Sequence, residues 1–178
     1  MSEALASTLK HLEALVGFDT RNPPRAIGTG GMFNYLQANL PGFRFQLTDF
    51  GAGAVALLAV RGNPKRVFNV HMDTVPDSPA WTASPHALRV TADRAIGLGA
   101  CDIKGAAAGM LSAAARTTGD AAFLFTTDEE ANDARCIAGF LAQGHGFTEA
   151  IVAEPTNCEA VLAHRGIASV LMKFQGQA

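Results

Sequence analysis

The sequence has no apolar run close to the roughly 20 residues that a membrane-spanning helix needs, and residues 1–4 lack the pattern of a signal peptide. It has only three cysteines, Cys101, Cys136 and Cys158, and no C-x-x-C pair. An odd number of widely spaced cysteines is more typical of free thiols in a reducing compartment than of a disulfide framework. We therefore expect a soluble, cytoplasmic protein.

The sequence also has no excess of positive charge. Its 14 Lys and Arg residues against 16 Asp and Glu residues give a formal net charge of -2, without a long run of like charges. Nucleic acids and anionic membranes attract basic surfaces, so neither is expected as a partner. The 178 residues, 48% of them hydrophobic, are enough for one globular domain with a substantial core.

Hydrophobic periodicity predicts helices that alternate with strands. Helices are expected at 3–17, 31–40, 105–115 and 134–143, with His11 on the exposed side of the first. Strands are expected at 43–50, 54–60, 66–70, 87–91, 121–125 and 150–153, and two more at 161–164 and 167–174. This order predicts an α/β fold with a mostly parallel central sheet flanked by helices.

Side chains that can bind metal follow several of the predicted strands. They are His71, Asp73, Asp102, Asp128, Glu129, Glu130 and Glu154. Ligands of open α/β sheets bind in the crevice at the carboxyl ends of the strands. Acidic residues that recur at these ends are therefore expected to converge in one cleft.

The local spacing of these residues favours a site with two metal ions. His71 and Asp73 are two residues apart, so on a strand both side chains face the same way. Asp73 can then accept a hydrogen bond from the His71 ring nitrogen that does not bind metal. Glu129 and Glu130 diverge, so one can bind metal while the other faces the substrate as a base. Asp102 can bridge two divalent ions, which together activate water for hydrolysis.

Each of these side chains also has a structural interpretation when it is considered alone. Asp73 can cap a turn, and Asp102 can cap the helix that follows it. The acidic residues 128–130 suit a helix N-terminus, and Glu154 can be a solvated strand end. These interpretations do not explain why acids and a histidine recur at the ends of separate strands.

Two further segments bear on binding. His164 and Arg165 stand at the end of a predicted strand and are candidates for contact with substrate, the alternative being an ordinary strand end. Gly97-Leu98-Gly99 lacks the third glycine of a dinucleotide-binding turn, and no G-K-[ST] follows it. The second segment therefore predicts a tight turn and disfavours a nucleotide-binding protein.

Four segments in this order resemble a known family. They are His71-Met72-Asp73-Thr74-Val75-Pro76, residues 97–105, Thr127-Asp128-Glu129-Glu130 and Glu154-Pro155-Thr156. Together they resemble the dinuclear metallo-aminoacylase and carboxypeptidase family over essentially the whole chain. Asn22-Pro23-Pro24-Arg25 and residues 128–133 and 162–166 are most similar to the branch that deacetylates N-acetyl-L-ornithine or N-acetyl-L-citrulline.

The resemblance implies a role for each candidate metal ligand. His71 and Glu154 would hold one ion, Glu130 would hold the other, and Asp102 would bridge the two. Two divalent ions, zinc or cobalt, are the implied cofactors. The implied reaction removes the acetyl group of N-acetyl-L-citrulline or N-acetyl-L-ornithine in arginine biosynthesis.

The resemblance also implies supporting roles and a domain arrangement. Asp73 would orient His71, and Glu129 would be the general base. Members of the family are longer, with an inserted lid and dimerisation domain and a further histidine that completes the second metal position. Residues 1–166 would thus belong to the catalytic domain and 167–178 to the first strand of the lid, through which any homodimer would form. A related dipeptidase or desuccinylase, and an inactive metal-binding fragment, are the open alternatives.

Overall fold

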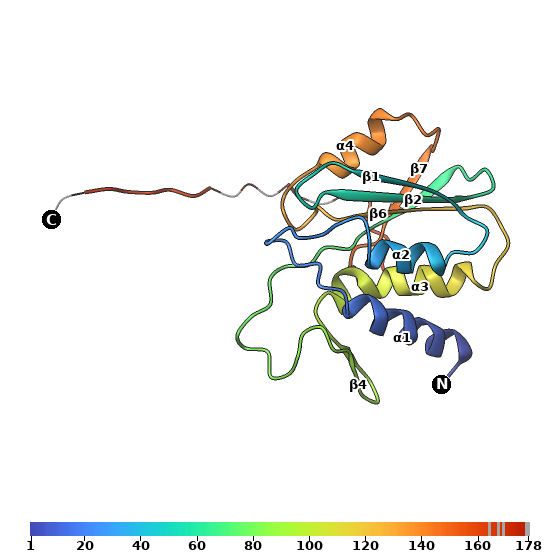
Figure 1. The fold of residues 1–178 in the computed structure, drawn as a ribbon, viewed down its shortest axis with the longest axis horizontal. Coiled ribbons are helices and arrows are strands. Elements are labelled where there is room, and N and C mark those ends of the chain that lie inside the picture. Colours follow the sequence, from blue (N-terminus) through green and yellow to red (C-terminus); the bar gives the residue numbers. More distant parts are fainter. Residues whose placement is uncertain (164, 167, 169, 177–178) are drawn as a thin grey trace.

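The computed structural model describes residues 1–163, 165–166, 168 and 170–176. It contains a five-stranded sheet with helices on both faces and a separate two-stranded hairpin (Figure 1). The elements in chain order are α1 (Glu3–Val16), α2 (Met32–Ala38), β1 (Arg44–Asp49), β2 (Val55–Arg61), β3 (Arg66–His71), β4 (Arg89–Val90), β5 (Ala95–Ile96), the turn η1 (Ala100–Lys104), α3 (Gly105–Ala114), β6 (Ala121–Thr126), α4 (Arg135–Ala142) and β7 (Glu149–Val152).

The central sheet has the strand order β1-β2-β6-β3-β7. Strand β3 is parallel to its neighbours β6 and β7, whereas β2 is antiparallel to its neighbours β1 and β6. Only β2 therefore runs against the other strands, which confirms the predicted α/β fold with a mostly parallel central sheet. The carboxyl ends of β3, β6 and β7 consequently lie at the same edge.

Each face of the sheet has its own apolar core. Leu57 and Phe125 face the layer formed by α1, α2 and α3, whereas Leu58 and Leu124 face α4 with the buried Cys136. Figure 1 shows these two helical layers on opposite sides of the sheet. Successive residues of a strand point to opposite faces, so both faces of β2 and β6 can be buried and their sequences are almost continuously apolar.

The four predicted helices are confirmed to within a few residues. Helix α1 begins after Ser2, whose hydroxyl accepts a hydrogen bond from the Leu5 amide at 3.2 Å. The predicted exposure of His11 is wrong, because its Nδ1 lies 2.8 Å from the hydroxyl of Tyr35 on α2 and only 8% of the residue is exposed. Tyr35 thus covers the side of α1 that the sequence pattern assigns to solvent.

Three strand predictions differ from the structure. The strand expected at 87–91 is only the two residues of β4, paired with the unpredicted β5. The strands expected at 161–164 and 167–174 are wrong over the residues that are described there, since these lie in no strand. Figure 1 shows the C-terminal segment running away from the sheet. A strand needs a neighbour to complete its hydrogen-bond ladder, and no strand of the described chain lies beside this segment.

The cysteines are free, and their exposure differs. Cys101 and Cys158 are exposed and Cys136 is buried, all three as free thiols. Burial raises the pKa of the Cys136 thiol to about 12. In the described part of the chain, no helix combines the length and apolar character required to cross a membrane.

Candidate metal centre

The carboxyl ends of β3, β6 and β7, together with η1, carry the side chains that the sequence predicts to bind metal. Ligand atoms of His71, Asp102 and Glu154 all lie within 4.8 Å of one another. Ligand atoms of His71, Glu129 and Glu130 form a second group within the same distance. The structure therefore brings together five residues that come from four separate segments of the chain.

His71 is the residue that the two groups share. It is the last residue of β3 and only 4% exposed. Its Nε2 lies 3.0 Å from Asp102 Oδ1 and 3.8 Å from Glu154 Oε1. Its Nδ1 faces Asp73, at 3.1 Å from the backbone oxygen and 3.5 Å from Oδ1. The ring is thus held through Nδ1 and presents Nε2 to the carboxylates.

The donor atoms around His71 Nε2 are arranged suitably for a divalent ion. Two ligand atoms that each lie about 2.0–2.2 Å from a tetrahedral ion are about 3.3–3.6 Å apart. The observed separations of 3.0 Å and 3.8 Å from Nε2 to Asp102 and Glu154 lie on either side of this range. Imidazole nitrogen and carboxylate oxygen are donors that zinc and similar ions accept. These residues therefore fit a metal ion with small side-chain adjustments.

The electrostatics of the cluster also favour a cation. Burial lowers the pKa of the His71 imidazole, but its hydrogen bond with Asp73 acts in the opposite direction. The charges of Glu154 and Asp102 add to that effect, and the pKa rises to about 9. Burial, together with nearby carboxylates, raises the pKa of Glu130, although His71 opposes this change. Neighbouring carboxylates thus contribute to both shifts, and bound divalent ions would neutralise their negative charge.

Asp73 connects the two groups. The residue has an exposed fraction of 0%. Its Oδ2 accepts hydrogen bonds from Asn22 Nδ2 at 3.1 Å and from the Glu130 amide at 3.0 Å. The carboxylate therefore touches the loop after β6 as well as His71. It does not merely cap a local turn.

Asp102 also departs from its alternative interpretation. Helix α3 has no side-chain cap, and Asp102 lies within η1 with φ -115° and ψ 90°. Its carboxylate faces His71, so it does not cap the helix. By contrast, Asp128 does have the structural role considered for it: its Oδ2 accepts a hydrogen bond from the Cys136 amide in the first turn of α4, at 2.8 Å.

Sequence reasoning missed Asn22 and Lys104. Lys104 is 1% exposed, and its Nζ donates to the Phe18 carbonyl at 3.0 Å. Burial lowers the pKa of Lys104 to about 8, although Asp19 and Asp73 oppose the change. Lys104 ties η1 to the segment after α1. The only signal in the sequence was its position two residues after a predicted metal ligand.

The two predicted substrate-binding residues, His164 and Arg165, are not tested by the described ligand groups. His164 lies outside the described residues. Arg165 is described and exposed in the C-terminal segment. Contact between either residue and substrate stays a prediction.

Gly99 is required where η1 begins. Its φ is 71°, and a Cβ added there would lie 2.5 Å from Thr74 Cγ2 and 3.3 Å from the Asp102 carbonyl oxygen. We expect Gly99→Ala to destabilise the fold by about 1–3 kcal/mol, through backbone strain and this overlap. Urea unfolding measures the change. Gly119→Ala, where an added Cβ meets open space, is the control and should change stability by less than about 0.5 kcal/mol. Equal stability of the two variants would contradict the requirement for glycine at position 99.

Curated proteins with similar sequences share this region. N-acetyl-L-citrulline deacetylase of Xanthomonas campestris pv. campestris is 66% identical over 179 residues, which cover 100% of this chain and 49% of the relative. Succinyl-diaminopimelate desuccinylase of Phenylobacterium zucineum is 31% identical over 155 residues, which cover 79% of this chain and 41% of the relative. The chain thus spans about half the length of the curated relatives it matches.

Structural similarity and a family match agree with the sequence comparison. The crystal structure of human carnosine dipeptidase 1 matches 84% of this chain and 38% of its own, with a TM-score of 0.64 and 16% sequence identity, which supports the fold. Residues 67–166, more than half of the 178 residues, match the sequence model of peptidase family M20/M25/M40. This segment includes all five residues of the two ligand groups. The chain belongs to peptidase family M20/M25/M40.

Proposed function

We propose that this chain provides the metal-binding part of an enzyme that removes the acetyl group from N-acetyl-L-citrulline in arginine biosynthesis. The observation that carries the proposal is the convergence of His71 Nε2 with Asp102 and Glu154 at the carboxyl ends of the strands. The substrate is proposed from the 66% identity to a deacetylase of that specificity.

In this proposal, His71 and Glu154 hold one ion, Glu130 holds a second, and Asp102 bridges them. The donor distances around His71 support the first position, and the grouping of Glu130 with His71 and Glu129 within 4.8 Å supports the second. Zinc or cobalt is the proposed metal. The ions would supply a water of lowered pKa and stabilise negative charge on the substrate carbonyl oxygen.

Glu129 is the proposed general base. It is exposed at the edge of the cluster, whereas the adjacent Glu130 is partly buried. The Glu129 carboxylate would take a proton from the attacking water while the water oxygen bonds to the acetyl carbon. It would then return that proton to the nitrogen as the C–N bond breaks, which releases acetate and the free amino acid. Asp73 would hold the His71 ring in position throughout.

Further proposals follow from the greater length of the curated relatives. Because the chain covers 49% of the Xanthomonas relative, we propose that selection of the substrate side chain and the last ligand of the second ion lie outside these 178 residues. Residues 1–166 would belong to the catalytic domain, and 167–178 would begin a lid through which a homodimer forms. A cytoplasmic location is proposed because the cysteines are free thiols.

A chimera tests the proposal. This chain would replace the matching 49% of the Xanthomonas campestris relative, and hydrolysis of N-acetyl-L-citrulline, N-acetyl-L-ornithine and succinyl-diaminopimelate would be compared. We expect acetylcitrulline to be hydrolysed with the highest kcat/KM, and the 178-residue chain alone to be nearly inactive. Because the portion of the relative would select the substrate side chain, the chimera tests the catalytic role of this chain and not its specificity. A folded, metal-loaded but inactive chimera would contradict the catalytic role.

A further inference from the structure

Asn22 occupies a position next to the metal centre that the proposed reaction does not use. The residue is 2% exposed. Its backbone amide donates to the Thr74 carbonyl at 2.8 Å, and the Thr74 amide donates to the Thr20 carbonyl at 3.0 Å. The backbone of Asn22 is therefore fixed beside the loop after β3, independently of its side chain.

The side-chain amide of Asn22 joins two loops of the site. Its Nδ2 donates to Asp73 Oδ2 at 3.1 Å and to the Thr127 carbonyl at 3.2 Å. Both partners can only accept hydrogen bonds when Asp73 is ionised, so the nitrogen and not the oxygen must face them. Both amide protons are thereby used, while Oδ1 is buried without a hydrogen-bond partner in the described structure. The side chain acts as a double donor.

The Asp73 carboxylate depends on such donors. It is completely buried, and its Oδ2 receives only the Asn22 amide and the Glu130 amide among the hydrogen bonds of the described residues. A buried carboxylate that loses a hydrogen-bond donor loses stabilisation of its charge and of its orientation. Because Asp73 also faces His71 Nδ1 at 3.5 Å, a change in its orientation would be transmitted to both His71 and Glu130.

We propose that Asn22 is a positioning residue, whose amide fixes the Asp73 carboxylate and so sets His71 and Glu130 relative to each other for metal binding. This inference rests on the metal centre of the proposed function. It adds a contribution from the segment between α1 and α2 to a centre otherwise built from the loops after β3, β6 and β7 and from η1.

The test is metal binding by the 178-residue chain, measured by calorimetric titration with Zn²⁺ and by the visible absorption spectrum of bound Co²⁺. Asn22→Leu keeps the approximate size of the side chain and removes both donors. We expect it to weaken binding about 10–100-fold, the range typical when a residue that orients a metal ligand is lost. The Co²⁺ bands should also shift. Asn22→Ser, which is smaller and cannot crowd the site, should weaken binding similarly.

Asn69→Leu is the matched control. Asn69 Nδ2 donates to the Leu124 carbonyl at 3.1 Å, so this variant also removes an asparagine donor between β3 and β6, but one that does not touch Asp73. Its metal affinity should stay within about 3-fold of the wild-type value. Its Co²⁺ absorption bands should not shift. Wild-type affinity in both folded Asn22 variants would overturn the inference and leave the metal centre intact. Failure of both to fold, with Asn69→Leu folded, would overturn it in favour of a purely structural role. Absence of metal binding by the wild-type chain would overturn the proposed function itself.

Discussion

Replacing His71 by alanine should lower the affinity of this chain for Zn²⁺ or Co²⁺ by more than about 100-fold, the upper end of what loss of an orienting residue costs. His71 is the one residue present in both groups of potential ligands. Its removal leaves carboxylates alone, which bind these ions less tightly than a set that includes imidazole. Calorimetric titration and metal analysis after dialysis measure the loss.

Thermal unfolding gives an independent measurement of the same prediction. An ion that binds only the folded chain stabilises it by about 2.7 kcal/mol when present at 100 times its dissociation constant. Wild-type protein should therefore unfold at a higher temperature with Zn²⁺ than without it. His71→Ala should lose most of this increase, and an equal increase in both proteins would contradict the assignment.

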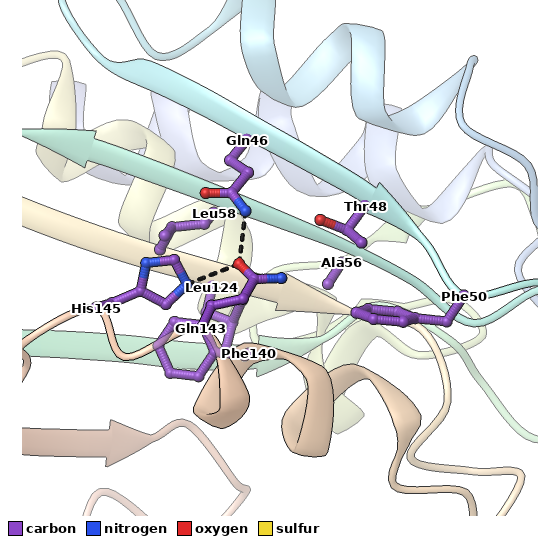
Figure 2. A pocket seen from close by; sticks show the side chains of 9 residues that line it. All are labelled: Gln46, Thr48, Phe50, Ala56, Leu58, Leu124, Phe140, Gln143 and His145. Atoms are coloured by element: carbon purple, nitrogen blue, oxygen red, sulfur yellow. Dashed lines mark hydrogen bonds between the residues drawn. The ribbon is translucent and has the colours of Figure 1, made fainter.

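His145→Ala is the matched control for the His71 variant. Figure 2 shows His145 on the face of the sheet that α4 covers, pointing toward Gln143. Its Nε2 lies 3.0 Å from Gln143 Oε1, and its ring stacks on Phe140 with a centroid distance of 4.8 Å. The variant also replaces a histidine by alanine, but His145 belongs to neither group of potential metal ligands among the described residues. Its metal affinity should match that of the wild type.

Local sequence patterns predicted the elements of this fold better than their arrangement. The periodicity of α1 and the apolar runs of β3 and β6 report which side chains are buried, and those elements were predicted within a few residues. The reversed direction of β2 depends on its pairing with β1 and β6, which no local pattern encodes. The same limit explains the C-terminal stretch, where apolar residues predict a strand but do not identify a neighbour to pair with.

In the site, too, the sequence predicted some residues and missed others. Placement at strand ends predicted the convergence of His71 and Glu154, because the carboxyl ends of the parallel strands β3 and β7 share one edge. Asp102 joins them from η1, which follows the separate β4–β5 hairpin. The hydrogen bond between Asn22 and Asp73 spans 51 residues. The segment Asn22-Pro23-Pro24-Arg25 contributed to the family resemblance, but nothing in the sequence indicated its contact with Asp73. Contacts of this kind follow from tertiary packing and became visible only in the structure.

Glu129→Gln, made in the chimera with the Xanthomonas relative, should lower kcat for acetylcitrulline by about 10²–10⁴-fold, the usual contribution of a general base. The amide cannot accept the proton of the attacking water, yet it keeps the size of the side chain. KM and the metal content should change little, because the proposed role of Glu129 is confined to the transition state. Steady-state kinetics and metal analysis of the same preparation measure both.

A control variant and a competing role for Glu129 can be tested together. Glu13→Gln, at an exposed position of α1, should leave kcat and metal content unchanged. Glu129 also has a carboxylate oxygen within 4.8 Å of ligand atoms of His71 and Glu130, so it could instead bind the second ion directly. In that case Glu129→Gln would lose metal and activity together, as Glu130→Gln is expected to do. Full metal content with lost turnover would identify Glu129 as the base, and an unchanged kcat would exclude both roles.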